Sequence, residues 1–406
     1  LPICYNGDVV NTVASISGNT FTYTSSVSGL PASGGGYVTS GAQGTSATNY
    51  GTPGIGGSIF TKLRFVNFGG CNTVTPKTDS GSSPYIDYAN DAAYVGDDQG
   101  NLYKISPVFT GTPAVKYCIA VSTGGLGSPV LDTSKPNGNV YVSDGKTVYA
   151  FTPGASSFTA AGSIQIGNSL CGQCSITDAP ILDSTNGWLY VFSSADTTGT
   201  NAIVSQMPLS LASHIDVPIG QTATPYVLDG TFDNNYWNNG PGVAGSTLYA
   251  CGTHSVVTPP SNVPSLYAIG FNSNGTVKTP PVMSDNVNVN PPGAVGACSP
   301  MTEFVNGNGT DQLFVGVGFF NNATAGGNQV TMWNITSQLT GSSTPPTAIA
   351  TGQLGGASGI VIDNVSTAAQ ASSIYFGTLA TSTTAPLPSC GSGNYCAVKL
   401  TQSGLQ

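Results

Sequence analysis

Charged side chains are scarce in this chain of 406 residues. Only 7% are Asp, Glu, Lys or Arg, with a single arginine (Arg64) and a single glutamate (Glu303), whereas an ordinary soluble domain has about 25%. Nine scattered cations in a chain of net charge −9 cannot build the basic surface that holds a phosphate backbone. The composition therefore excludes nucleic-acid binding. A surface of Gly, Ser, Thr and Asn is typical of proteins exported from the cell.

Histidine and long apolar runs are also lacking. The two histidines, His214 and His254, are too few for a Ser-His-Asp triad or a histidine metal centre. No stretch approaches the roughly 18 apolar residues of a membrane-spanning helix, and the sequence shows neither an initiator Met nor a signal peptide. We expect a processed chain without a membrane span of its own, secreted or held at a cell surface.

Nine cysteines with so little histidine favour disulfides over metal ligation. An odd number leaves one cysteine unpaired or linked to another chain. The CxxC motif that begins at Cys171 is followed by Ser175, where a c-type haem site needs histidine, and no βαβ pattern suggests a redox role. We predict three structural pairings: Cys390 with Cys396, Cys171 with Cys174, and Cys4 with Cys71.

A repeated pattern of short strands organises the chain. Within residues 127–151, three apolar runs alternate with turns rich in Asp, Asn, Gly and Pro, which is typical of antiparallel hairpins. The pattern occurs six times, with a period of about 47 to 65 residues, and periods near 40–50 residues predict a β-propeller. Its middle strand has an aromatic residue at Tyr94, Tyr141, Tyr190, Tyr249, Phe314 and Tyr375.

We therefore predict an all-β fold, a β-propeller of six four-stranded blades over residues 57–406. Only six residues follow Leu400, so residues 59–66 are expected to add the fourth strand of the last blade and close the ring. Residues 1–56 contain one charge, Asp8, and a strand near residues 20–27. This N-terminal extension could be a strand pair on the rim, an arm donated to a neighbouring subunit, a disordered segment or a seventh, degenerate blade.

The repeats resemble the PQQ-like (quinoprotein-type) propeller repeat. Ser83–Ile105 and Gly127–Phe151 match its S-P-V-x-x-D-G, V-Y-V-G-S and D-G-x-L-Y-A-L pattern well, copies four to six match loosely, and the resemblance covers roughly residues 57–400. The family's enzymes add a recurring Thr-Gly…Trp docking motif, an acidic base, calcium ligands and a basic residue near the quinone. Here no blade has that motif, and the three tryptophans occupy unrelated positions: Trp188, Trp237 and Trp333. The resemblance thus implies the fold without a cofactor or any catalytic residue.

An acid ends the first strand of each copy, where Asp is typically a cap for the turn that follows. We interpret all six as structural: Asp87, Asp132, Asp183, Asp229, Glu303 and Asp363. Residues 97–101 (DDQGN) resemble a calcium loop but lack the later bidentate acid. We predict no metal site there, with adventitious Ca²⁺ as the alternative.

The insertion at residues 232–239 is the most binding-like loop, because it sets aromatic residues beside Asn and Asp. Its candidate contact residues are Phe232, Asp233, Tyr236 and Trp237, which suit carbohydrate or a protein partner; a loop packed over the ring mouth is the alternative. Glycosylation sequons stand at Asn274, Asn308, Asn322, Asn334 and Asn364, although several are expected by chance in so Asn- and Thr-rich a chain.

These observations lead to a functional hypothesis. Low charge removes the repulsion that keeps soluble proteins apart, and the uncharged residues 1–56 exceed what the ring needs. We expect a secreted, non-enzymatic propeller that self-associates, through residues 1–56 and its blade edges, into a homo-polymer such as a filament or sheath at the cell surface. An extracellular glycan- or protein-binding propeller is the second hypothesis, and a quinoprotein-type oxidoreductase is the third.

Overall fold

The structure is a computed structural model. It describes the backbone of six short strands between residues 3 and 62, and then residues 71–72, 82–168, 176–221, 227–257, 260–286, 297–318, 329–339, 346–351, 353, 356–363, 372–379 and 396–401. Strands dominate these residues, and one short helix is present among them. The predicted all-β class is confirmed.

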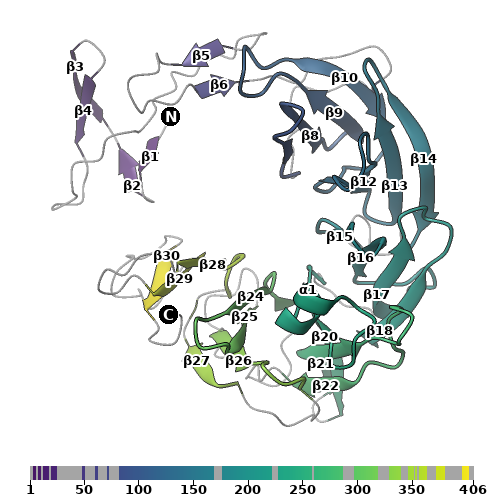
Figure 1. Cartoon of the computed structure of the whole chain (residues 1–406). Helices are drawn as coiled ribbons and strands as arrows, with labels where there is room; N and C mark the ends of the chain where they lie inside the picture. Colours follow the sequence, from purple (N-terminus) through teal and green to yellow (C-terminus); the bar gives the residue numbers. More distant parts are fainter. Residues whose placement is uncertain are drawn as a thin grey trace.

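Six antiparallel sheets follow one another along the chain (Figure 1). The first three comprise β7 (Tyr85–Asp87), β8 (Ala92–Gly96), β9 (Asn101–Ile105) and β10 (Val115–Ala120); β11 (Val130–Leu131), β12 (Val140–Ser143), β13 (Thr147–Pro153) and β14 (Phe158–Gln165); and β15 (Ile181–Asp183), β16 (Trp188–Ser193), β17 (Asn201–Pro208) and β18 (Ile215–Gln221). Each is a meander in which sequential strands are neighbours, as the repeat predicts.

The second half continues this scheme with more variation. The fourth sheet has β19 (Thr231–Phe232), β20 (Thr247–Val257), β21 (Pro260–Gly270) and β22 (Met283–Asn286), with helix α1 (Asn234–Asn239) between the first two. The fifth has β23 (Ala297–Cys298) and β24 (Thr302–Val305), both paired with β25 (Asp311–Gly318), and then β26 (Gln329–Asn334) and β27 (Ala348–Thr351). The sixth has β28 (Val361–Asp363), β29 (Ser373–Gly377) and β30 (Ala397–Thr401).

The sheets are arranged radially along an arc, as in a β-propeller (Figure 1). The first strand of each sheet lies on the inner side of the arc: β11 contacts both β7 and β15, and β19 contacts β24. The sheets differ from the predicted six four-stranded blades in two places. The inner strand of the fifth sheet is divided into β23 and β24, and the sixth sheet has three described strands.

Apolar clusters between adjacent sheets hold the arc together. Because side chains alternate between the two faces of a strand, each middle strand can pack against both neighbouring sheets. In the first five sheets the repeated aromatic packs toward the next sheet; for example, Tyr94 lies among second-sheet residues, Tyr249 among fifth-sheet residues and Phe314 among sixth-sheet residues. Burial of these rings removes large apolar areas from water, which is the main stabilising contribution in such a fold.

The N-terminal strands form three separate two-stranded ladders. β1 (Ile3–Tyr5) pairs with β2 (Asp8–Val10), β3 (Thr12–Ser17) with β4 (Thr20–Thr24), and β5 (Thr48–Tyr50) with β6 (Phe60–Lys62). The strand predicted near residues 20–27 is therefore present. The expectation that residues 59–66 complete the last blade is not met, because β6 pairs with β5 and no described strand pairs with the outer edge of β30.

Two disulfides have both cysteines among the described residues, and they join different partners from those predicted. Cys71 bonds Cys118 on β10, so the predicted Cys4–Cys71 pairing is wrong. Cys251 on β20 bonds Cys298 on β23, which ties the fourth sheet to the fifth. Cys396 is disulfide-bonded. Its predicted partner Cys390, like Cys171 and Cys174, lies outside the described residues.

Candidate functional site

The predicted binding loop at residues 232–239 is folded as a strand end and a helix. Asp233 caps α1, because its carboxylate accepts a hydrogen bond from the Tyr236 N–H at 2.8 Å. The Phe232 and Tyr236 rings stack with centroids 3.9 Å apart. The Tyr236 hydroxyl donates to Asp183 at 2.6 Å. Phe232 and Tyr236 are therefore packing residues, contrary to the prediction.

Trp237 is the one residue of that prediction whose side chain is free to contact a partner. It is 83% exposed, whereas the neighbouring Tyr236 is buried. The sequence does not separate the aromatic residues that turn inward from the one that turns outward. A helix capped by Asp233 places successive side chains about 100° apart, which is what divides them.

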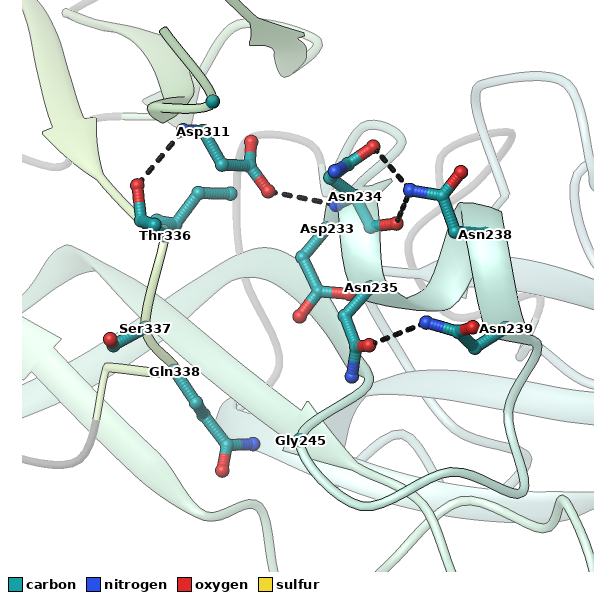
Figure 2. Close-up of a pocket in the computed structure, with 12 residues that line it drawn as sticks. Asp233, Asn234, Asn235, Asn238, Asn239, Gly245, Asp311, Thr336, Ser337 and Gln338 are labelled. Atoms are coloured by element: carbon teal, nitrogen blue, oxygen red, sulfur yellow. Dashed lines mark hydrogen bonds between the residues drawn. The ribbon is translucent and has the colours of Figure 1, made fainter.

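A polar cleft of about 480 Å³ lies between α1 and the fifth sheet (Figure 2). Four asparagines of α1 form one wall, and residues 309–311 and 335–338 of the fifth sheet form the other. The asparagine amides bond along the helix, from Asn238 to Asn234 and from Asn239 to Asn235, each at 2.9 Å. The Asn234 N–H reaches across the cleft to the Asp311 carboxylate at 2.8 Å. The two sheets are thus bridged by a direct hydrogen bond.

Three acids gather at this cleft, namely Asp233, Asp311 and Glu303. Asp311 is only 4% exposed, and its Oδ1 atom and the Glu303 Oε1 atom receive no hydrogen bond from a donor group elsewhere. Burial, followed by a hydrogen bond to Asp311 and the negative charges of Asp311 and Asp233, raises the pKa of Glu303 to about 8. At neutral pH the Glu303 carboxyl is therefore protonated, and its O–H group donates a hydrogen bond to the Asp311 carboxylate.

Stability should consequently fall in alkaline solution. The folded-state pKa of Glu303, about 8, lies above the unfolded value of about 4.3, so this contribution is fully present below pH 4 and is lost as the pH rises through 8. Since the carboxyl is partly exposed, we discount the full linkage value and expect a loss of about 2 kcal/mol. Urea denaturation at pH 5, 7 and 9 measures it.

The variant Glu303→Gln retains the donor but cannot ionise. It should be about as stable as the parent at pH 5 and more stable at pH 9. Asp363→Asn, at the same repeat position in the sixth sheet, is the control. Equal pH profiles for the parent and Glu303→Gln would contradict the shared proton.

The acids that end the first strands differ in their roles. As predicted, three are caps: Asp87 accepts from Asn90, Asp132 from Ser134 and Asp183 from Asn186. Asp229 instead accepts a hydrogen bond from the backbone of the fifth sheet, and burial together with the charge of Asp178 raises its pKa to about 7. Glu303 shares its proton with Asp311. The prediction that every one of these acids caps a turn is therefore wrong for Asp229 and Glu303.

The calcium-like loop at residues 97–101 is an ordinary, fully bonded turn. The Asp97 carboxylate accepts hydrogen bonds from Gln99 N–H, Asn101 N–H, Asn101 Nδ2 and Tyr103 hydroxyl, at 2.8–2.9 Å. These donors occupy the oxygens that a cation would need. In the part of the chain that the structure describes, no three His, Cys, Asp or Glu side chains are placed to hold a metal ion.

His214 does lie near an acid and a serine, yet their order is not that of a hydrolase. The His214 Nδ1 atom is 2.7 Å from Asp216 Oδ1, and the Ser205 hydroxyl donates to the same oxygen at 2.5 Å. A catalytic triad needs the imidazole between serine and acid, whereas here Asp216 stands between them. The side chain of His254 lies outside the described residues.

Three of the five sequons are described, and their asparagines are all exposed: Asn274, Asn308 and Asn334. Asn274 stands in the turn between the third and fourth strands of its sheet, Asn308 in the turn between β24 and β25, and Asn334 is the last residue of β26 before the link to β27. In an antiparallel meander these positions share one end of the sheet, so the three sequons lie at the same end of the fourth and fifth sheets. Asn322 and Asn364 lie outside the described residues.

Among the described strands, none pairs with the outer edge of β30, which we call the open edge of the sixth sheet, and no described sheet covers one of its faces. Val361, Tyr375 and Lys399 form one cross-strand row, and they occupy the face opposite to the one that packs on the fifth sheet. Val361 is 66% exposed, and the Lys399 ammonium lies 5.6 Å from the centre of the Tyr375 ring. The middle-strand aromatic residue is buried in the other five sheets. In the sixth sheet this residue, Tyr375, faces outward.

Beside the open edge lies an apolar hollow of about 250 Å³ between β27 and β30. Its lining includes Leu400 and Ile349, and the Ile349 side chain is 51% exposed. In the second sheet the corresponding place is filled by the fourth strand, β14, whose Phe158 packs on Tyr94 and Tyr117 of the first sheet. The hollow and the open edge together have the form of a seat for a missing fourth strand.

No helix among the described residues is long and apolar enough to cross a membrane. No protein-family model and no curated protein matches the sequence. Similar solved structures include Saccharomyces cerevisiae Sqt1 (10% identity, 74% of this chain and 69% of that chain, TM-score 0.48), the Dos1 propeller (10%, 74% and 68%, 0.44) and a luciferin-regenerating enzyme (11%, 80% and 92%, 0.41). Similarities at this level carry no argument about function.

Proposed function

We propose that this protein is a secreted, non-enzymatic structural subunit that self-assembles by strand addition at the cell surface. The observation that carries the proposal is the strand seat at the sixth sheet, formed by the open edge of β30 and the hollow beside it. An unpaired strand edge offers a row of backbone donors and acceptors to any extended segment. A sheet that lacks its outer strand is therefore a specific place for another copy to bind.

The N-terminal residues supply the matching segment. β4 pairs with β3 on one edge, and none of the described strands pairs with its other edge. Its sequence is Thr-Phe-Thr-Tyr-Thr, so Phe21 and Tyr23 share one face of the strand and the threonines share the other. We infer that this aromatic face enters the hollow of a neighbouring copy, in the way that Phe158 of β14 enters the corresponding place in the second sheet.

The scarcity of charge fits such packing. Residues 1–61 have one charged side chain, Asp8, so the strand loses little hydration energy when a neighbouring subunit covers it. The disulfide between Cys251 and Cys298 is consistent with an oxidising, extracellular compartment. A head-to-tail contact of this kind propagates as a filament when the rotation between successive copies does not close into a ring.

Electron microscopy of the native material, beside a variant that lacks residues 1–56, tests assembly. We expect ordered polymers from the full chain and single particles from the truncated one. The double variant Phe21→Ser/Tyr23→Ser should behave like the truncation, whereas Thr20→Ser/Thr22→Ser, on the opposite face, should still assemble. Single particles of the full chain at all concentrations would overturn the proposal.

Cross-linking then separates exchange between copies from closure within one copy. A photoreactive residue at Lys399 of an isotopically light chain, mixed with an unmodified heavy chain before assembly, should capture heavy peptides from residues 1–56. Capture of light peptides alone would mean that each chain fills its own seat.

A further inference from the structure

Two exposed aromatic rings lie stacked at one end of the first sheet. Tyr88 is in the turn between β7 and β8, and Phe109 is in the turn between β9 and β10; they are 78% and 57% exposed. Their ring centres are 5.3 Å apart and their planes differ by only 4°. Exposed aromatic residues usually occur singly and need no explanation, but a parallel pair presents a flat apolar platform to solvent.

This platform is held in place by Asp91. The Asp91 carboxylate accepts hydrogen bonds from the Val108 N–H at 2.8 Å, the Phe109 N–H at 2.6 Å and both the N–H and the hydroxyl of Thr110. Its backbone adopts a left-handed φ of 48°, which is unfavourable for a side chain other than Gly, Asn or Asp. Asp91 suits this backbone and fixes the turn that presents Phe109, as in a preorganised binding site.

A groove of about 880 Å³ begins next to the platform, between the first and second sheets. Ala89 and Asn90, which follow Tyr88, line it together with the turn at residues 133–138 and Thr152. The turns between first and second strands, and between third and fourth, lie at one end of each meander. The platform and the groove therefore open on the same face of the molecule.

Lys104 projects into this groove from β9. Its ammonium lies 5.8 Å and 5.6 Å from the centres of the Tyr94 and Tyr117 rings, and no carboxylate of the described residues is within ion-pair distance of it. Burial lowers the pKa of Lys104. The two acids that line the groove, Asp87 and Asp132, are buried and bonded to Asn90 and Ser134. The half-buried ammonium, which packs near two aromatic rings and feels the charge of Asp87 without an ion pair among the described residues, is thus left to donate hydrogen bonds to a ligand.

We propose that the Tyr88–Phe109 platform and the Lys104 groove form a saccharide-binding site. The C–H groups of a sugar ring carry slight positive charge and pack on the negative face of an aromatic ring, which Tyr88 offers at the groove entrance. Hydroxyl or carboxylate oxygens of the next sugars would accept hydrogen bonds from Lys104 and Asn90. The groove volume lies in the range of ordinary ligand sites. A polyhydroxylated chain suits this lining of amides, hydroxyls and one ammonium better than an apolar peptide does.

Affinity gel electrophoresis in the presence of soluble polysaccharides tests the site, using neutral ones (hydroxyethyl cellulose, galactomannan, starch) and acidic ones (polygalacturonate, hyaluronate). We expect at least one to retard the full-length protein. Tyr88→Ala and Lys104→Met should each weaken that binding tenfold or more. Stronger retardation by acidic than by neutral polysaccharides, lost in Lys104→Met, would identify a carboxylate as the partner of the ammonium.

Val243→Ala is the control, because Val243 is also an exposed apolar side chain but lies beside the fourth sheet; it should bind like the parent. Asp91 is a positioning residue, so Asp91→Ala should weaken binding. Asp91→Asn keeps an oxygen that accepts from the Val108 and Phe109 N–H groups but sets an amide donor against Thr110, so it should weaken binding less than Asp91→Ala does. The proposal is overturned if no polysaccharide retards the protein, or if Val243→Ala is as weak as Tyr88→Ala. Loss of self-assembly in Tyr88→Ala without any saccharide binding would assign the platform to contacts between copies and would equally overturn it.

Discussion

Replacing Phe314 by alanine is expected to lower the free energy of unfolding by about 3–5 kcal/mol, the usual cost of deleting a buried phenyl ring. Phe314 is the middle-strand aromatic of the fifth sheet. It is fully buried in the cluster that joins this sheet to Ile374 and Phe376 of the sixth. The alanine variant loses the apolar area of the ring and also leaves a cavity, because neighbouring strands are fixed by their hydrogen bonds. Urea denaturation followed by tryptophan fluorescence measures the change.

Tyr375→Ala is the matched comparison, since Tyr375 occupies the same repeat position in the sixth sheet. It has no following sheet to pack against, and Lys399 is its nearest partner across the strand. We therefore expect a loss of about 1 kcal/mol or less for the dispersed chain. A similar large loss in both variants would mean that the outward face of the sixth sheet is already covered within a single chain.

The repeats made most of this architecture predictable. Strands of alternating polarity separated by Asp-Gly or Asn-Gly turns have few alternative folds, and an aromatic returning once per repeat marks the strand that is buried on both faces. Tyr94, Tyr141 and Tyr190 are each buried as that pattern requires. The sixth sheet departs from the pattern because it has only three described strands, β28, β29 and β30, and its Tyr375 is only partly buried.

For the repeated acids, the sequence reveals contacts with nearby residues but not contacts made across strands. Asp87 and Asp183 cap their turns because the residue three positions later is an asparagine, and this is visible in the sequence. Glu303 also has an asparagine three positions later, Asn306, so this local pattern does not set it apart; being the only glutamate of the chain was the one signal that did. Its pairing with Asp311 depends on β24 and β25 being adjacent, so only the structure could reveal it.

Neither the Cys71–Cys118 nor the Cys251–Cys298 disulfide was predicted from the sequence, although the repeat length was a signal for both. Both described disulfides link cysteines 47 residues apart, close to the shortest repeat length, and so each joins positions that are one blade apart. The predicted pairings relied on short loops instead. In a radial repeat protein, neighbouring blades bring residues one period apart into contact, which makes the repeat length a better guide than closeness in sequence.

These two disulfides provide a sharp test, because loops of equal length should stabilise equally if chain entropy alone matters. The loop-entropy relation gives about 4 kcal/mol for each. We expect Cys71→Ala/Cys118→Ala to lose roughly that amount. Cys251→Ala/Cys298→Ala should lose more, since Cys251 and Cys298 are buried between sheets and their removal also leaves a cavity.

Urea denaturation of the two double variants, with and without dithiothreitol, measures both contributions. Reductant should destabilise the parent more than either variant, because the parent loses both bonds and each variant loses only the one it retains. Equal losses of unfolding free energy in the two double variants would mean that both disulfides act only by lowering the entropy of the unfolded chain. A parent that resists reductant while folded, yet loses stability once it has been unfolded in reductant, would place the buried bond among the structural disulfides of secreted proteins. The proposed function requires this behaviour, because a subunit that is secreted and assembles through its sixth sheet would depend on the fifth and fourth sheets to hold that sheet in place.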